Sequence, residues 1–322
     1  MICLGIEGTA HTAGVAVVTS KKNILSDVRD MYTKETGGII PAEAAQHHKK
    51  AFPILIRKAF QEAQISKVDL VAYSRAPGLP PSLKETLNAA IDIAKDLNVP
   101  LIGVNHCISH LSSAHFFTGA KDPVYVFVSG ANTQIIALEG GKFRIFGETL
   151  DSGLGNALDK FGRALGLGFP AGPKIEELAK YGKYIELPYT VKGMDLSFSG
   201  IITSAIDKFK RGISKEDLCF SLQETLFAML AEVTERALAY TRKGEAVIIG
   251  GVAANKRLSE MLSIMCRERD AKFYAVPIEY SGDQSVMIGL QGILEYQAGI
   301  RTKKSDINPY ERIEEIKVAW NY

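Results

Sequence analysis

The sequence predicts an α/β protein of two similar lobes with a cleft between them, and three observations support this. An apolar strand, a Gly- and Thr-rich turn and a second apolar strand occur twice, at 2–18 and at 124–138. Each of these hairpins is followed by helical stretches and by a strand–loop–helix unit. Strands that alternate with helices are typical of a parallel core sheet, and the repeat indicates a duplicated layout.

The first half of the chain contains five predicted elements in order. Apolar runs rich in β-branched residues at 2–7 and 13–18 predict two strands joined by a tight turn. A third strand is expected at 69–74, and the stretch 83–97 is helical after a Pro-rich loop. The run at 100–104 predicts another strand, directly before two histidines.

The second half repeats this order. Strands are expected at 124–128 and 134–138, again around a turn rich in small residues. A buried strand is expected at 245–249, and a helix at 256–269 after a Gly-Gly turn. The last stretch, 307–322, is expected to pack back on one lobe as a tail or short helix.

The repeat sets the expected domain boundaries. Residues 1–120 form the first lobe, 303–322 pack back on it, and 121–302 form the second lobe. The alternative is one doubly wound sheet whose two hairpins match by chance.

Composition excludes several classes of protein. The 38 Lys and Arg residues balance 36 Asp and Glu residues, so a disordered charged chain is excluded. The four cysteines form no CxxC pair, which argues against a zinc finger or a secreted disulfide scaffold. No apolar run approaches the ~18 residues that would span a bilayer. A soluble cytoplasmic protein without membrane contact is therefore expected.

Three turns are candidates for binding phosphate, because glycine allows close approach and small-residue turns expose several N–H groups. Each also has an ordinary explanation, since hairpins need glycine in their turns. The P-loop and dinucleotide-binding motifs are absent from the sequence. The turns contain Gly5, Gly8, Thr9 and Thr12; Ser129, Gly130, Asn132 and Thr133; and Gly250 and Gly251.

The pair His106 and His110 has the i, i+4 spacing that puts two imidazoles on one helix face, as a metal site requires. A metalloprotease is excluded because Cys107 stands where the motif needs a general base. Asp283, in a small-residue turn before a helix, is a candidate third ligand, although its spacing alone favours a helix N-cap. Two histidines and a carboxylate suit iron or zinc.

Two further carboxylates lie near predicted helix starts. Asp159 falls on a short amphipathic helix, and Glu176 follows the Gly172–Pro173 helix start by one turn. Carboxylates near a nucleotide often hold ribose hydroxyls, but each of these also suits a solvated helix surface.

Six motifs resemble those of one family, and the resemblance extends from residue 2 to about 300. They are Gly-Ile-Glu-Gly-Thr-Ala at 5–10, Gly-Val-Asn-His-Cys-Ile-Ser-His at 103–110, Val-Ser-Gly-Ala-Asn-Thr-Gln at 128–134, Gly-Glu-Thr-Leu-Asp at 147–151, Met-Asp-Leu-Ser-Phe-Ser-Gly at 194–200 and Gly-Gly-Val-Ala-Ala-Asn at 250–255. In combination they resemble the universal tRNA threonylcarbamoyladenosine transferases, in the archaeal and eukaryotic branch that forms the catalytic subunit of the KEOPS complex.

The resemblance implies an actin/Hsp70/sugar-kinase-like fold with a nucleotide between its lobes. It implies a metal-dependent acyltransferase that moves threonylcarbamoyl from threonylcarbamoyl-AMP to N6 of adenosine 37 in ANN-decoding tRNAs and releases AMP. Implied partners are tRNA, a kinase-like ATPase subunit and a small dimerising subunit of KEOPS. Implied cofactors are one divalent metal, iron or zinc, and an ATP- or AMP-type nucleotide.

Site residues follow by matching the family's motifs. The metal ligands match His106, His110 and Asp283. The nucleotide or donor contacts match Phe127, Val128, Ser129, Gly130, Ala131, Asp159, Gly172, Glu176 and Asn255, to which the glycine turns add Gly8, Thr9, Asn132, Gly250 and Gly251.

The chain departs from the family pattern at the site itself. The family usually has Tyr where this chain has Phe127, and a second Gly where it has Ala131, which needs φ below zero to be unstrained. A second hypothesis is therefore a non-catalytic, ATP-binding paralogue that acts as a scaffold or regulatory subunit.

Overall fold

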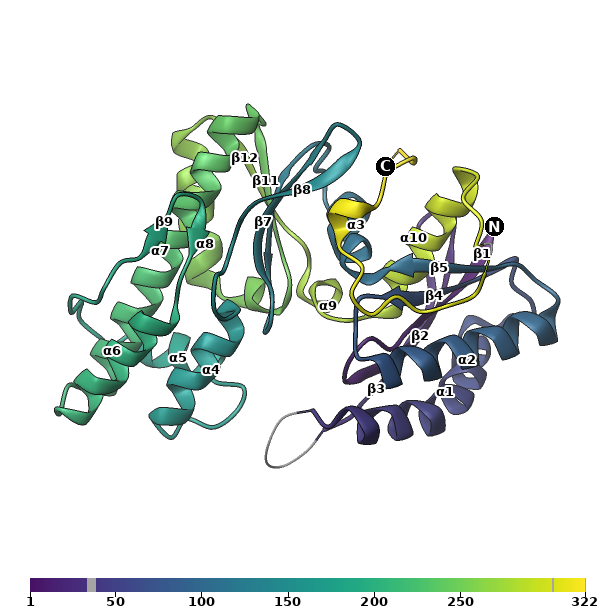
Figure 1. Ribbon diagram of the computed structural model, residues 1–322, viewed down its shortest axis with the longest axis horizontal. Helices are drawn as coiled ribbons and strands as arrows, with labels where there is room; N and C mark the ends of the chain where they lie inside the picture. Colours follow the sequence, from purple (N-terminus) through teal and green to yellow (C-terminus); the bar gives the residue numbers. More distant parts are fainter. Residues whose placement is uncertain (34–38, 303, 322) are drawn as a thin grey trace. The chain divides into compact units, whose positions relative to one another are not determined.

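A computed structural model describes residues 1–33, 39–302 and 304–321. The chain forms two compact units (Figure 1). Unit 1 comprises Met1–Phe116 and Asp283–Tyr322, and unit 2 comprises Phe117–Gly282. Residues 303 and 322, the ends of the predicted returning segment, lie outside the described residues. No described helix is both long and apolar enough to cross a membrane.

Unit 1 contains a five-stranded sheet in the order β3-β2-β1-β4-β5. β1 pairs antiparallel with β2 and parallel with β4, β2 pairs antiparallel with β3, and β4 pairs parallel with β5. The strands are β1 (Ile2–Glu7), β2 (Thr12–Thr19), β3 (Ile24–Met31), β4 (Leu70–Ala76) and β5 (Leu101–Asn105).

Helices cover both faces of this sheet. Because side chains alternate along a strand, Leu4 and Ile6 of β1 join one core with α1 (Pro41–Ala63) and α2 (Pro80–Leu97). Gly5 points to the opposite face, where α10 (Ser285–Gln297) packs on β1, β2, β4 and β5. Unit 1 also contains α3 (His106–Phe117), except its last residue, and the short η2 (Ile313–Glu315).

Unit 2 repeats the sheet. Its strand order is β12-β11-β6-β7-β8, with β6 antiparallel to β7 and parallel to β11, and β11 parallel to β12. The strands are β6 (Val124–Val128), β7 (Thr133–Glu139), β8 (Lys142–Glu148), β11 (Glu245–Ile249) and β12 (Lys272–Ala275), with a separate pair β9 (Val191–Lys192) and β10 (Asp195–Leu196). The predicted duplication is thereby confirmed, strand for strand.

The helices of unit 2 enclose a large apolar core. The long α7 has only a weak amphipathic pattern, because it is buried along most of its length. The other helices are shorter and connect strands or loops. They are α4 (Leu154–Ala164), α5 (Gly172–Ala179), α6 (Ser199–Lys210), α7 (Lys215–Thr241), η1 (Gly251–Ala254), α8 (Lys256–Glu268) and α9 (Ile278–Ser281).

The structure corrects the predicted boundary at residue 302. Residues 283–302 belong to unit 1 and not to the second lobe, because α10 docks on the sheet of unit 1. That docking depends on small residues. A Cβ on Gly292 would lie 2.4 Å from the Ala72 Cβ, and a Cβ on Gly5 would lie 2.4 Å from the Ser285 carbonyl oxygen.

Candidate functional site

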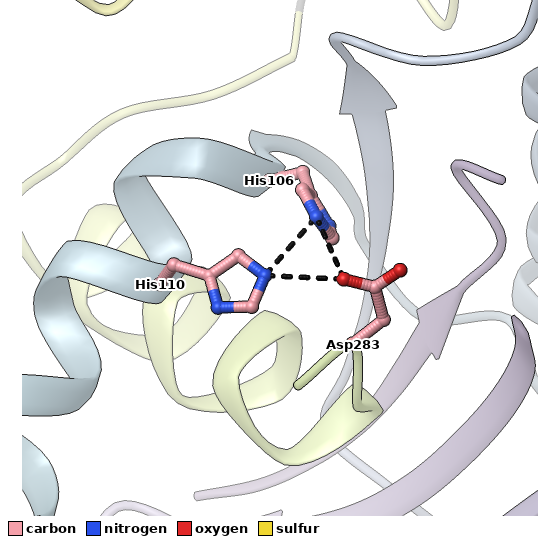
Figure 2. A group of neighbouring side chains, drawn as sticks. All are labelled: His106, His110 and Asp283. Atoms are coloured by element: carbon pink, nitrogen blue, oxygen red, sulfur yellow. Dashed lines mark hydrogen bonds and ion pairs between the residues drawn. The ribbon is translucent and has the colours of Figure 1, made fainter. Parts of the chain in front are cut away.

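Three side chains of unit 1 converge on one point, as Figure 2 shows. His110 Nε2 lies 3.2 Å from His106 Nε2 and 3.3 Å from Asp283 Oδ1. His106 Nε2 lies 3.4 Å from the same carboxylate oxygen. Among the described residues, this is the one group of three His, Cys, Asp or Glu side chains compact enough to hold a metal ion. The structure therefore brings together the three predicted ligands.

Helix α3 supplies both histidines. The i, i+4 spacing places the rings on one face, with centroids 4.6 Å apart and planes nearly perpendicular at 86°. Asn105, the last residue of β5, caps the helix: its Oδ1 accepts a hydrogen bond from the Ile108 N–H at 3.1 Å. The end of a buried strand thus fixes where the first histidine begins its helix.

Asp283 comes from the segment just before α10. The side chain that caps α10 is that of Gln284, whose Oε1 accepts from the Met287 N–H at 2.8 Å. The N-cap alternative for Asp283 is therefore wrong, and its carboxylate faces the histidines. Gly5 allows α10 to pack close to β1, because a Cβ at this position would lie 2.6 Å from the Gly289 nitrogen.

A fourth residue, Glu7, contacts the Nδ1 side of His106 and was not predicted. Its Oε2 lies 2.9 Å from His106 Nδ1, and its Oε1 accepts from the Thr9 N–H at 2.8 Å and the Thr9 hydroxyl at 2.6 Å. Because an ionised carboxylate only accepts, this contact places a proton on Nδ1 and turns Nε2 toward the site. One sequence feature could have identified Glu7. It is a carboxylate at the last position of a buried strand, two residues after Gly5 and therefore on the same face of the sheet.

Burial and neighbouring groups shift the pKa values of the three ligands in different directions. Burial opposes ionisation of Asp283, yet hydrogen bonds from His106 and His110 hold the pKa of its carboxyl well below its usual value. Burial lowers the pKa of His110, so that imidazole is neutral at pH 7. Burial would also lower the pKa of His106, but Glu7 and Asp283 raise it well above its usual value.

The geometry and chemistry of the three ligands fit a divalent ion. Two imidazole nitrogens and a carboxylate oxygen are a donor set used by zinc and iron. Bonds of about 2.0–2.2 Å in a tetrahedral arrangement separate ligand atoms by about 3.3–3.6 Å. The observed separations are 3.2, 3.3 and 3.4 Å. His106, His110 and Asp283 can therefore hold such an ion with little rearrangement.

In unit 2, the predicted turn after β6 is tightly closed. The Ser129 N–H donates to the Asn132 carbonyl at 2.8 Å, and the Asn132 N–H donates to the Ser129 hydroxyl at 3.0 Å. The start of α4 packs on this turn through the Gly155 N–H, which donates to the Ser129 carbonyl at 3.1 Å. Within the described part of the chain, the N–H groups of Gly130 and Ala131 have no protein acceptor. Ala131 has no positive φ, so its Cβ causes no backbone strain.

The Gly-Gly turn lies at the same sheet edge, because β6 and β11 are parallel neighbours. Gly250 has a φ of 103°, and a Cβ there would lie 2.2 Å from the Val128 carbonyl oxygen. At Gly251, a Cβ would meet no described atom within 4 Å. The carboxyl edge of parallel strands is where α/β proteins commonly bind ligands, so these turns are suitably placed.

The predicted polar contacts of unit 2 also have partners within the protein. Asp159 Oδ1 accepts from the Ala171 N–H at 2.8 Å and so links α4 to the start of α5 at Gly172. Glu176 Oε1 accepts from the Lys256 N–H at 2.8 Å, at the start of α8.

Asn255 caps α8 by accepting from the Leu258 N–H at 3.1 Å. Its amide nitrogen donates to Gln223 Oε1 at 3.1 Å, so both ends of the side chain are used. Phe127, the residue that stands in place of the family's usual Tyr, is buried in β6. These positions are explained by the fold of unit 2, and their contact with a nucleotide stays a prediction.

The N–H groups of Gly8 and Thr9, unlike those of Gly130 and Ala131, donate to acceptors within the described part of the protein. The Gly8 N–H donates to the Ser74 hydroxyl at 3.2 Å, and the Thr9 N–H donates to Glu7. A Cβ on Gly8 would lie 2.2 Å from the Thr86 hydroxyl, so packing explains this glycine. The N–H groups expected to face a phosphate thus have acceptors inside unit 1.

Almost the whole chain can be aligned with proteins of one known family. Residues 23–290 match the sequence model of a family described as tRNA N6-adenosine threonylcarbamoyltransferase. A curated protein of that name from Thermococcus sibiricus is 54% identical, with 99% of this chain and 100% of the relative aligned. Another of the same name from Archaeoglobus fulgidus is 51% identical over 100% of both chains.

Solved structures with low sequence identity share the fold. HypF from T. kodakarensis is 17% identical with a TM-score of 0.62, covering 95% of this chain and 49% of the other. A ROK family glucokinase from Streptomyces griseus is 13% identical with a TM-score of 0.52, covering 91% and 99%. The expected sugar-kinase-like α/β fold is therefore confirmed.

Proposed function

The chain belongs to the tRNA N6-adenosine threonylcarbamoyltransferase family, and we propose that it transfers a threonylcarbamoyl group to N6 of an adenosine in tRNA. The donor is threonylcarbamoyl-AMP, the acceptor is adenosine 37 of ANN-decoding tRNAs, and AMP is released. The observation that carries the proposal is the convergence of His106, His110 and Asp283 in a chain with 54% identity to a relative of that name.

The reaction exchanges one bond at the carbamoyl carbon. The N6 amine of adenosine attacks this carbon, a C–N bond forms, and the bond from carbon to the phosphate oxygen breaks. The phosphate leaves as part of AMP, and N6 gives up a proton. A catalyst must therefore polarise the carbonyl and bind the leaving phosphate.

Unit 1 supplies the first of these needs. A bound divalent ion would act as a Lewis acid toward an oxygen of the donor. His106, His110 and Asp283 would hold that ion, and Glu7 orients the His106 ring from behind at 2.9 Å. Asn105 and the Gly5 contact set the positions of α3 and α10, so the three ligands are preorganised.

Unit 2 supplies groups suited to the leaving phosphate. The N–H groups at Gly130 and Ala131 and the open space beside Gly251 lie at the carboxyl edge of β6 and β11. Small-residue turns of this kind bind phosphate oxygens. Asp159, Gly172, Glu176 and Asn255 would support the nucleotide from α4, α5 and α8.

The finer assignments extend the same proposal. The ion is iron or zinc, because both accept two imidazoles and a carboxylate. The protein works in the cytoplasm with the KEOPS subunits, a kinase-like ATPase and a small dimerising protein. The names of the full-length relatives favour catalysis over the scaffold alternative.

A transfer assay tests the proposal. Purified protein is mixed with labelled threonine, bicarbonate, ATP, a synthase that makes the adenylate, the partner subunits and an ANN-decoding tRNA. We expect label on tRNA from the wild type and none from His106→Ala, because a ligand is lost. His115→Ala, a change of another buried histidine on α3, is the matched control and should retain transfer. Label from His106→Ala equal to the wild type would contradict the proposal.

A further inference from the structure

The segment after α10 returns across the ends of β4 and β5. Within residues 304–311, the Asp306 carbonyl accepts from the Tyr73 hydroxyl at 2.8 Å, and the Asn308 N–H donates to the Arg75 carbonyl at 2.9 Å. Tyr73 is fully buried, so this anchor is internal to unit 1. The segment is therefore part of the packed structure on which α3 begins.

Glu311 is the acidic residue of this segment that reaches furthest inward. Its side chain is only 8% exposed, although it ends in a carboxylate. Oε1 pairs with the Arg75 guanidinium, and Oε2 accepts from Asn105 Nδ2 at 3.1 Å. A buried carboxylate needs such partners, and here each oxygen has one.

The contact with Asn105 decides which way that amide points. An amide has a donor end and an acceptor end of nearly equal shape. Because the Glu311 carboxylate only accepts, it holds Nδ2, and Oδ1 must face the first turn of α3. There Oδ1 accepts from the Ile108 N–H at 3.1 Å. Asn105 is 2% exposed, so no solvent compensates a reversed amide.

We propose that Glu311 is a positioning residue for the His106–His110–Asp283 metal site, acting through Asn105. Arg75 fixes the carboxylate, the carboxylate fixes the amide, and the amide fixes the first turn of α3, whose first residue is His106. This inference rests on the metal site in the proposed function. It predicts that a residue in the C-terminal segment controls metal affinity without touching the metal.

Zinc affinity of the full-length protein, measured by competition with a chromophoric chelator, tests the proposal without any transfer activity. Glu311→Gln keeps the volume but removes the carboxylate that orients Asn105. Asn105→Asp keeps the cap but sets two carboxylates against each other. We expect each change to weaken zinc binding about 10-fold, the size of effect found for groups that orient metal ligands.

The double variant Asn105→Asp, Glu311→Gln is the decisive arm. The carboxylate introduced at position 105 would again accept from Ile108. The amide introduced at position 311 would donate to that carboxylate and accept from Arg75. Because the hydrogen bonds are restored with donor and acceptor exchanged, zinc affinity should return to within about 2-fold of the wild type. A merely structural role for Glu311 predicts additive losses instead.

Two controls separate the possible failures. Tyr73→Phe removes another anchor of the same segment but no contact to Asn105, so it should leave zinc affinity unchanged. Equal zinc affinity in Glu311→Gln and the wild type would overturn the inference while leaving the metal site intact. Equal affinity in His106→Ala and the wild type would overturn the metal site itself, and the inference with it.

Discussion

Units 1 and 2 share one strand order but use the turn after the central strand in opposite ways. In unit 1, β1 ends in Glu7, which accepts the Thr9 N–H and supports His106. In unit 2, β6 ends in Val128, and the N–H groups of Gly130 and Ala131 keep no described protein acceptor. The turn after β1 is preceded by a carboxylate that contacts a metal ligand, because β1 ends in Glu7. The turn after β6 has no such carboxylate, and its N–H groups without a described protein acceptor are suited to bind an anion.

The two units therefore diverge at the carboxyl edges of their parallel strands. The helices that follow differ too. In unit 1, β5 leads directly into α3 with its two histidines, whereas its counterpart in unit 2, β12, leads into the short α9. We therefore expect changes in unit 1 to alter metal affinity and changes in unit 2 to alter nucleotide affinity.

The largest effects are expected from two glycine variants with similar clashes. In Gly5→Ala the new Cβ would lie 2.4 Å from backbone of α10, and in Gly250→Ala it would lie 2.2 Å from the Val128 carbonyl. Each should reduce the free energy of unfolding of its unit by about 3 kcal/mol. Thermal unfolding measures that loss. Only Gly5→Ala should weaken zinc binding in molecules that remain folded, because only it displaces Asp283.

A loss of zinc affinity of equal size in Gly250→Ala would contradict the expectation that unit 1 alone holds the metal. It would mean that the sheet edge of unit 2 contributes to holding the metal ligands.

The next effect concerns Glu7. In Glu7→Gln an amide nitrogen must face either His106 Nδ1 or the Thr9 donors, so one hydrogen bond becomes a donor–donor contact. Zinc affinity should fall about 10- to 100-fold by chelator competition. Glu176→Gln, a matched change in unit 2, should leave zinc affinity unchanged. Wild-type affinity in Glu7→Gln would remove Glu7 from the site.

A pH effect is expected from Glu295 on α10. Burial raises the pKa of its carboxyl to about 7, from an ordinary value of 4.5, near Arg75 and Glu311. Between these values the folded state holds a proton that the unfolded chain has released, so the free energy of unfolding falls as pH rises through that window. Glu295→Gln keeps the acceptor for Gln291 and should flatten this slope.

Above pH 8 the same variant should stabilise unit 1 by about 1–3 kcal/mol. Urea unfolding at pH 5 and pH 8 measures the difference. An unchanged slope between the two pH values in Glu295→Gln would contradict the assignment of this dependence to Glu295.

The smallest effect on stability is expected from Gly251→Ala, since a Cβ there meets no described atom within 4 Å. The free energy of unfolding should stay within about 0.5 kcal/mol of the wild type. AMP binding, measured by calorimetry, should weaken about 5-fold if a phosphate occupies that space. Unchanged AMP affinity would show that the phosphate does not bind at this turn.

Local patterns in the sequence predict much of the fold. Alternating apolar runs and small-residue turns gave both hairpins, and the i, i+4 spacing placed His106 and His110 on one helix face. These features depend on neighbours in the chain, so periodicity is sufficient to find them.

Long-range contacts were beyond such patterns. The spacing of Asp283 allowed a helix cap as well as a metal ligand, and only the close approach of α10 to Gly5 decides between them. Glu7 and Glu311 were missed because their partners lie 99 and 206 residues away in sequence. The close packing at Gly5 determines where Asp283 lies. Hydrogen bonds to the carboxylates, which only accept, determine where Glu7 and Glu311 lie.

Transfer activity measured against metal occupancy in one preparation tests whether transfer depends on the metal held by His106, His110 and Asp283. Metal is removed by a chelator, and then iron or zinc is added back in steps while label on tRNA is counted. We expect transfer activity to fall as the metal is removed, to return as metal is added back, and never to return in His106→Ala. Full transfer by wild-type protein that holds no metal would contradict this expectation.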